Sequence, residues 1–264
     1  MPQKGDNMTT VFQKTSCEKH AVIDPDKTHK RIADFPEICI TTFGRELVDE
    51  LSSLPGAEKL VDLSSANGKY PVYKIEYKGV PIAVYMSMVG APGSAMQMEE
   101  AIAYGARKFV VFGSCGILDD ERATGKIIVP THAIRDEGTS YHYLPASEEI
   151  ALEEESVRLL SAVLEREGIP YIQGKTWTTD ALYRETRERV NERRAQGCIA
   201  VDMECASLCA VAKFRNVPFV QYLYGADNLD ASDWQRRDLN DHGVTKAGLY
   251  CRIALECALA LHSA

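Results

Sequence analysis

Apolar residues along this chain follow two kinds of pattern, and the alternation between them predicts an α/β protein. Short continuous apolar runs are typical of buried strands, whereas apolar residues at positions i, i+3, i+4 and i+7 are typical of helices. Segment 70–77 instead alternates and meets the run at 80–88 through a Lys78-Gly79 turn, which predicts a hairpin or two adjacent strands. The other predicted strands lie at 36–42, 109–112, 126–130, 171–178, 198–201 and 217–224, and the clearest predicted helices lie at 150–167, 203–214 and 244–261.

Two carboxylates stand where a predicted strand passes into a predicted helix. Asp202 and Glu204 follow the apolar run at 198–201 and precede an Ala- and Cys-rich helix. Free N–H groups at a helix start favour ionised carboxylates, and ligands of α/β sheets bind at the carboxyl ends of strands. Such acceptors suit the hydroxyl groups of a sugar. Capping of the helix is an equally good interpretation of this stretch alone.

Two further strands end in residues that suit a binding site. The strand at 109–112 leads into Gly113-Ser114-Cys115-Gly116, where glycines let backbone N–H groups approach a ligand and Ser114 offers a hydroxyl. The strand at 217–224 delivers Asp227, which at a strand's carboxyl end is placed for acid–base chemistry. Taken singly, a Gly-Ser turn and an aspartate that opens a surface loop are common structural features.

These three motifs occur together in one known family. Phe112-Gly113-Ser114-Cys115-Gly116, Asp202-Met203-Glu204 and Tyr224-Gly225-Ala226-Asp227, in this order, resemble the nucleoside phosphorylases, which include the hexameric bacterial purine nucleoside phosphorylases and the uridine phosphorylases. The resemblance covers roughly residue 38 to the C-terminus. It implies a three-layer α/β/α sandwich with a mixed, partly barrel-like central sheet, with an N-terminal arm at 1–35 and a single domain at 36–264.

The resemblance also implies a role for each matched residue. In the family the Met-Glu pair holds the ribose, an aspartate at the position of Asp227 protonates or hydrogen-bonds purine N7, and a histidine from a neighbour's N-terminal segment reaches the 5′ hydroxyl. Arg236 or Arg237 resembles the family's lid arginine, which would tune the pKa of Asp227 by pairing with it. The expected residues are therefore Asp227 for catalysis, Met203, Glu204 and His20 for ribose, and Cys115, Gly116, Leu182, Tyr183 and Asp202 for the base.

The phosphate site is where this sequence departs most from the family. The family's Gly-Asp-Pro-x-Arg loop is reduced here to Thr41-Thr42-Phe43-Gly44-Arg45, and Val111 stands where the family usually has an arginine that contacts phosphate. Loss of one such charge-assisted contact typically costs about 1.5–3 kcal/mol. The remaining candidates are Gly44, Arg45 and Ser114, with Lys69 near the position at which family hexamers lend an arginine across the dimer.

Two features favour a purine as the base. Asp227 can donate a proton to N7, an atom that uracil lacks, and the Gln-x-Arg clamp for uracil is replaced in register by Thr186-Arg187-Glu188. The loop Glu137-Gly138-Thr139-Ser140, in contrast, resembles that of uridine phosphorylases. We therefore expect phosphate-dependent cleavage of a purine nucleoside to free base and ribose 1-phosphate. The alternatives are a uridine phosphorylase, a phosphate-independent nucleosidase, for which Val111 argues, and a non-catalytic nucleoside-binding protein.

Composition indicates which classes of partner and which cellular compartment to expect. A chain of 264 residues with 45% hydrophobic residues and a net charge of −8 fits one domain with a substantial core, and argues against nucleic acid or a membrane as main partner. The eight cysteines include no metal-type Cys-x-x-Cys pair and are expected to be reduced core thiols. Without a membrane-spanning run or a signal peptide, a cytoplasmic protein is expected. The resemblance implies nucleoside and phosphate as substrates, no metal or organic cofactor, and a homo-oligomer, either a dimer or a trimer of dimers.

Overall fold

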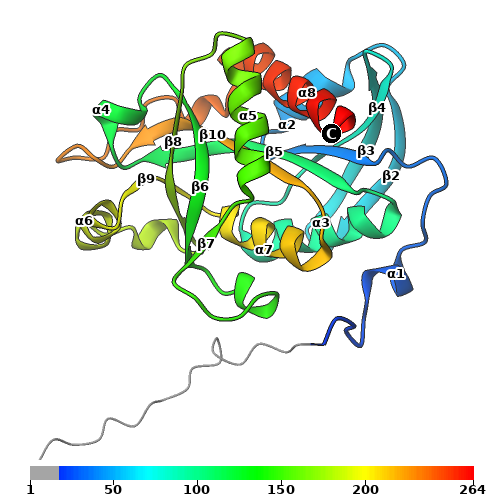
Figure 1. Cartoon of the computed structure of the whole chain (residues 1–264), viewed down its shortest axis with the longest axis horizontal. Helices are drawn as coiled ribbons and strands as arrows, with labels where there is room; N and C mark the ends of the chain where they lie inside the picture. The colour runs from blue at the N-terminus through cyan, green and yellow to red at the C-terminus, as the bar shows by residue number, and fades with distance from the viewer. Residues whose placement is uncertain (1–17) are drawn as a thin grey trace, which may run out of the picture.

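All strands of the computed structural model, which describes residues 18–264, belong to one ten-stranded sheet (Figure 1). The strands are β1 (Ile38–Thr42), β2 (Glu58–Ser65), β3 (Gly68–Tyr77), β4 (Val80–Met86), β5 (Lys108–Ile117), β6 (Ile127–Asp136), β7 (Glu149–Ala151), β8 (Tyr171–Thr179), β9 (Cys198–Asp202) and β10 (Phe219–Asn228). Their order is β10-β6-β8-β9-β5-β1-β4-β3-β2, with β7 paired to β6.

The sheet is mixed and closes on itself at one side. β5 runs parallel to β1 and β10, whereas β3 pairs antiparallel with β2 and β4. Because β10 pairs with both β6 and β5, the strands β10, β6, β8, β9 and β5 form a closed ring. The predicted α/β fold with a mixed, partly barrel-like sheet is confirmed.

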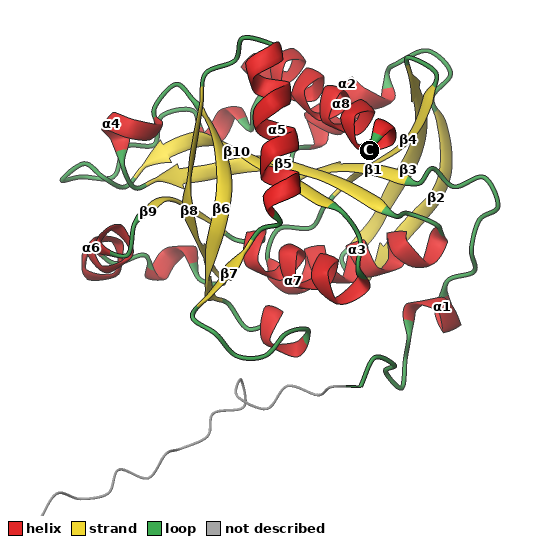
Figure 2. Cartoon of the chain, viewed as in Figure 1, coloured by secondary structure: helices red, strands yellow, loops and turns green. Residues whose placement is uncertain are grey.

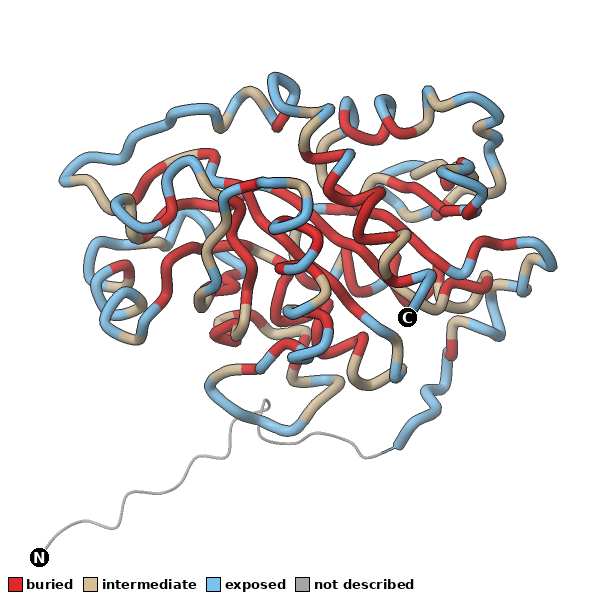
Figure 3. The backbone as a smooth tube through the Cα atoms, turned by 45° about the horizontal axis from the view of Figure 1, so that its top comes forward, coloured by how far each residue is buried: buried red, intermediate tan, exposed pale blue. Residues whose placement is uncertain are grey.

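Helices cover the sheet on two sides (Figure 2). Helices α2 (Arg45–Ser52), α5 (Glu154–Arg166) and α8 (Ala247–Ser263) share one hydrophobic cluster with the strands, and α3 (Ala91–Tyr104) and α7 (Cys205–Arg215) share the other. The buried stretches in Figure 3 run through the strands and the inner faces of these helices. The remaining helices are α1 (Pro25–Thr28), α4 (Asp120–Ala123), α6 (Arg187–Ala195) and the 3₁₀ turns η2 (Ser140–His142), η3 (Leu182–Arg184), η4 (Leu239–Asp241) and η5 (Val244–Lys246).

Aromatic packing fixes β5 against β10, the two strands whose carboxyl ends carry predicted site motifs. Phe112 stacks on Tyr222 with ring centroids 5.1 Å apart, and the Tyr222 hydroxyl donates a 2.6 Å hydrogen bond to the carbonyl of Tyr250 in α8. At the next position a Cβ on Gly113 would lie 2.6 Å from the Phe43 ring. Glycine is therefore required there by close approach of a side chain.

The predicted elements agree with the structure over the core strands and differ at several helices. The helix predicted from residue 203 begins at Cys205, the segment predicted as one helix at 150–167 begins as β7, and the last helix begins at Ala247 after η5. Strand β2 and helix α6 had no prediction. The reason is that both are largely polar, since β2 buries only Leu63 and α6 only Val190.

The N-terminal segment that the structure describes lies beside α3. His29 packs edge-on against Tyr104, with ring centroids 5.2 Å apart, and its Nε2 lies 3.7 Å from Glu100 Oε1. Residues 1–17 of the predicted arm lie outside the described residues.

Composition predicted reduced core cysteines and no membrane-spanning segment, and the described residues agree with both. The cysteines within residues 18–264 are all buried and free, whereas Cys17 lies outside that range. In the same part of the chain, every helix is too short or too polar to cross a membrane.

Candidate active site

The carboxyl ends of three neighbouring strands bring the three sequence motifs together. Gly116 in β5 pairs with Val201 in β9 on one side and with Asp227 in β10 on the other. A Cβ on Gly116 would lie 2.8 Å from Val201 Cγ1 and 3.3 Å from Asp227 Oδ1, so the side chains of both neighbouring strands close over this glycine. Segments 112–116, 202–204 and 224–227 therefore lie side by side, and their roles in binding and catalysis stay predictions.

Asp202 caps the start of α7. Its Oδ2 accepts hydrogen bonds from the backbone N–H groups of Glu204 and Cys205 at 2.8 and 2.6 Å. Its Oδ1 accepts from the Thr176 and Thr178 hydroxyls at 2.9 and 3.0 Å. Burial raises the pKa of this carboxyl and the four hydrogen bonds lower it. The capping interpretation is thus the one that this side chain fulfils, while its predicted contact with a base stays a prediction.

Glu204 joins two loops at the same end of the sheet. Its Oε1 accepts a 2.6 Å hydrogen bond from the N–H of Gly90, the residue that precedes α3 and has a φ of +95°. The side chain is only 6% exposed, and burial, followed by the charge of Asp202, raises its pKa to about 8. Met203 beside it is half-buried. A buried carboxyl of this kind hydrogen-bonds strongly to sugar hydroxyls that replace water.

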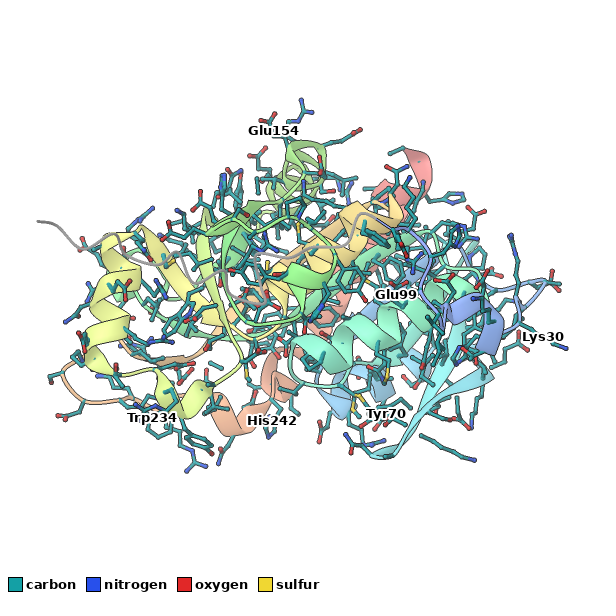
Figure 4. All side chains as sticks on the ribbon, turned by 90° about the horizontal axis from the view of Figure 1, so that it is seen from below. Lys30, Tyr70, Glu99, Glu154, Trp234 and His242 are labelled. Atoms are coloured by element: carbon teal, nitrogen blue, oxygen red, sulfur yellow. The ribbon has the colours of Figure 1, made fainter. Side chains whose placement is uncertain are left out.

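Asp227 is held by a tryptophan. The indole Nε1 of Trp234 donates a 2.6 Å hydrogen bond to Asp227 Oδ2, and Trp234 lies at the same edge of the molecule as His242 (Figure 4). Burial raises the pKa of Asp227, while this hydrogen bond and the charge of Arg237 lower it. The predicted lid arginines bond elsewhere: Arg236 donates to Asn240 and Arg237 to Asp120 and Thr124.

A second carboxylate near Asp227 escaped the sequence prediction. Glu185 follows η3 and is half-buried, and burial together with the charge of Asp227 raises its pKa to about 7. Two signals in the sequence could have pointed to these neighbours of Asp227. Glu185 is an acidic residue directly after the predicted base segment, and Trp234 is the one large aromatic residue of the polar segment 229–242.

The predicted base segment forms η3, on the surface of the protein. The side chains of Leu182 and Tyr183 are 46% and 92% exposed. Arg187 donates to the carbonyls of Leu229, Ala231 and Ser232, and Arg189 pairs with Asp136 at 2.8 Å. Both arginines that stand near the register of the family's uracil clamp are therefore used to hold the chain itself.

The predicted phosphate residues lie at the ends of β1 and β5, which are paired strands. Gly44 precedes α2, Arg45 is its first residue and exposed, and Ser114 is exposed near the end of β5. The carbonyl oxygen of His242 lies 3.1 Å from the position of a Cβ on Gly44, so the segment after β10 covers this turn. Val111, in contrast, is fully buried between the sheet and α3 and α7, so the residue that replaces the family's arginine is a core residue.

Comparison with known proteins agrees with this geometry. A model of the phosphorylase superfamily matches residues 37–257. The chain belongs to the phosphorylase superfamily. This result confirms the predicted family, the nucleoside phosphorylases, and the predicted enzyme class, the pentosyltransferases.

The relatives and structures similar to this phosphorylase differ in the nucleoside they are named for. A guanosine phosphorylase of Halorubrum lacusprofundi is 26% identical over 81% of this chain and 88% of its own. A uridine phosphorylase of Thermococcus kodakarensis is 34% identical over 44% of this chain and 42% of its own. A purine nucleoside phosphorylase of Toxoplasma gondii, solved with immucillin-H, has a TM-score of 0.73 at 20% identity over 86% of this chain and 92% of its own, a similarity of fold.

His20 of this phosphorylase lies apart from the residues around Gly116. Its side chain is 90% exposed, and its Nδ1 lies 3.1 Å from Asp24 Oδ2. It lines a cavity of about 1080 Å³ between residues 18–29, α3, η2 and the end of α7, and neither Glu204 nor Asp227 lines that cavity. A contact between His20 and a ribose in a neighbour's site stays a prediction.

Proposed function

We propose that this phosphorylase cleaves the N-glycosidic bond of a purine nucleoside with inorganic phosphate, yielding the free base and ribose 1-phosphate. The observation that carries the proposal is the placement of the two carboxyls beside Gly116: Glu204 follows directly after β9, Asp227 lies in β10, and these two strands flank Gly116. Cleavage of this bond builds positive charge on the ribose and negative charge on the departing base, so a site must stabilise both. Two carboxyls with different surroundings supply these two functions.

The reaction balances with the residues of this chain and the two substrates. A phosphate oxygen forms a bond to C1′ as the C1′–N9 bond breaks, and the electrons of that bond pass to the purine. Asp227, protonated, transfers its proton to N7, while the hydrogen phosphate ion releases its own proton to solvent, from which Asp227 is protonated again. Burial supports this role because it raises the pKa of Asp227 and so favours the protonated form. The proposed reaction involves no metal or organic cofactor.

At the ribose end, Glu204 would bind the 2′ and 3′ hydroxyls and Met203 would pack against the sugar. The hydrogen bond from Gly90 orients Oε1 of Glu204, which supports a fixed position for the bound ribose. Holding the sugar in one place is itself catalytic, because it replaces an encounter in solution by a reaction within one complex.

At the base end, a purine is supported over uracil by the use of Arg187 and Arg189 elsewhere in the fold. Asp227 hydrogen-bonds an atom that only a purine has. The rest of the base site would be lined by Cys115, Gly116, Leu182 and Tyr183. Asp202 is the further residue expected to contact the base.

At the acceptor end, Gly44, Arg45 and Ser114 would bind phosphate. A second reaction, hydrolysis by a nucleosidase, is favoured by Val111, because this fully buried apolar residue supplies no cation to the anion site. The two reactions differ in whether water or phosphate attacks C1′.

One panel of assays tests the proposal. The protein is incubated with inosine, guanosine, adenosine and uridine, each with and without phosphate, and release of base is measured. We expect fast release from a purine nucleoside only with phosphate. Release without phosphate would identify a nucleosidase, faster release from uridine would overturn the purine preference, and binding without release would indicate a non-catalytic nucleoside-binding protein.

The homo-oligomer is a proposal of the same kind. Because His20 lies away from Glu204 within one chain, a shared site requires a second copy to bring it there. Light scattering that shows an active monomer would overturn the shared site.

A further inference from the structure

The lid tryptophan, Trp234, is unusual among the side chains that contact the proposed site. It is hydrogen-bonded to the carboxyl that we assign as the acid, yet 54% of its surface is exposed. Indole is a large apolar ring with one polar N–H, and such rings are normally covered by other groups. A ring fixed at its polar edge and uncovered over much of its surface is available to a flat ligand at Asp227.

The base segment itself offers little aromatic cover. Leu182 stands where the family has an aromatic residue against the nucleobase. Tyr183 directs 92% of its surface to solvent. Trp234, which is hydrogen-bonded to Asp227, therefore supplies an aromatic surface at the acid that Leu182 does not.

The segment that carries Trp234 is held at its base. Asn228 and Gln235 exchange two backbone hydrogen bonds, at 2.9 and 3.0 Å, and their side chains share a third at 3.0 Å. Between them, residues 229–234 form a closed loop, and the Arg187 guanidinium from the start of α6 holds the carbonyls of Leu229 and Ala231 at 2.6 and 2.7 Å. The loop cannot move far as a whole, so the Trp234 ring stays within reach of Asp227 while its side chain rotates.

We propose that Trp234 is a base-binding residue of this protein: its indole leaves Asp227 Oδ2 and packs on the face of the purine when Asp227 bonds to the base. The inference rests on the proposed function, since it requires a purine at Asp227. It also says which group leaves Asp227 when the base binds: the indole N–H of Trp234. While it is bonded to Oδ2, the indole N–H stabilises the ionised carboxylate, and its departure frees Oδ2 for the base.

Intrinsic fluorescence tests the contact directly, because the chain has two tryptophans and they differ in environment. Trp177 is fully buried, with its Nε1 bonded to Asp136. The ligand is 9-deazainosine, a nucleoside analogue whose C–C glycosidic bond is not cleaved. We expect the emission of wild type to change on saturation and the emission of Trp234→Phe, which reports Trp177 alone, to stay constant.

Affinity separates stacking from the hydrogen bond. Trp234→Ala should weaken 9-deazainosine binding by about 5- to 150-fold, the range for loss of one aromatic–base stack. Trp234→Phe keeps an aromatic face and should lie near wild type. Adding Leu182→Phe to Trp234→Ala restores an aromatic ring to the base segment and should recover part of the loss, which a general structural defect would not allow.

The outcomes distinguish this inference from the proposed function. Calorimetry that shows tight binding of 9-deazainosine to wild type and to Trp234→Ala alike, with no change in emission, would overturn the role of Trp234 and leave the function standing. If 9-deazainosine fails to bind wild type at all, the purine site itself is wrong and the role of Trp234 is wrong with it.

Discussion

The two ends of the proposed site are built in different ways. At the ribose end, Glu204 is 6% exposed and accepts a hydrogen bond from the backbone N–H of Gly90. At the base end, Asp227 is half-buried and its partner Trp234 sits on a loop with more than half of its surface exposed. The ribose end is therefore fixed by the core of the fold, whereas the acid at the base end is held by one exposed side chain.

The largest effect is expected at the base end. Asp227→Asn keeps the size of the side chain and removes the transferable proton, so purine cleavage should fall by about 10²- to 10⁴-fold, the range for general acid–base catalysis. A nucleoside analogue with an activated leaving group serves as the control, since it departs without protonation and should be affected far less. Equal losses for both substrates, or unchanged purine turnover, would remove Asp227 from the role of acid.

The next effect is expected at the ribose end. Glu204→Ala removes the acceptor for two hydroxyls and should lower the rate on the order of 10²-fold. Discrimination against 2′-deoxynucleosides should fall as well, because the variant no longer reads the 2′ hydroxyl. If the folded variant has wild-type kinetics, Glu204 does not bind the ribose and its role is limited to the hydrogen bond with Gly90.

The third prediction concerns the free energy of unfolding, which should depend on the hydrogen bonds of Asp202. In wild type, both carboxylate oxygens of Asp202 accept hydrogen bonds. Asp202→Asn replaces one of these oxygens by an amide NH₂ group, which cannot accept them. Each donor left unpaired lowers the free energy of unfolding by about 1–3 kcal/mol. Asp49→Asn, an exposed position in α2, is the matched control and should leave the unfolding free energy near that of wild type. Denaturant unfolding of the two variants measures the difference, and equal midpoints would contradict the network around Asp202.

The last prediction concerns pH. The pKa of Glu204 rises from 4.5 to about 8 in the folded protein, so between these values the folded state binds more protons than the unfolded state. Stability contributed by this group is therefore present at low pH and lost as pH rises toward 8. Glu204→Gln cannot titrate and should show a flatter dependence of unfolding free energy between about pH 5 and pH 8. Parallel curves for the two proteins would mean that the pKa of Glu204 is not raised.

The sequence is informative where the chemistry lies on strand ends. Each of the segments 112–116, 202–204 and 224–227 could be assigned to the carboxyl end of a strand because buried strands are recognisable. That the three lie together was implied by the resemblance to one family, and the strand pairing agrees with it. The choice between a cap and a ligand at Asp202 could not be made, because it depends on Thr176 and Thr178 from another strand.

Contacts that the loops make over the sheet were also beyond prediction. Arg187 holds carbonyls more than 40 residues away, and the partner of Asp227 proved to be Trp234, although the sequence suggested an arginine. Such partners follow from how loops pack over the finished sheet. Local patterns of residues carry no information about that packing.

Product analysis tests the central claim most directly. The wild-type protein is incubated with inosine and excess inorganic phosphate, and the reaction is followed by ³¹P NMR together with the release of hypoxanthine. The account predicts a ribose 1-phosphate resonance that grows in step with the free base. Hypoxanthine released with free ribose, or phosphate left unchanged while inosine disappears, would contradict it.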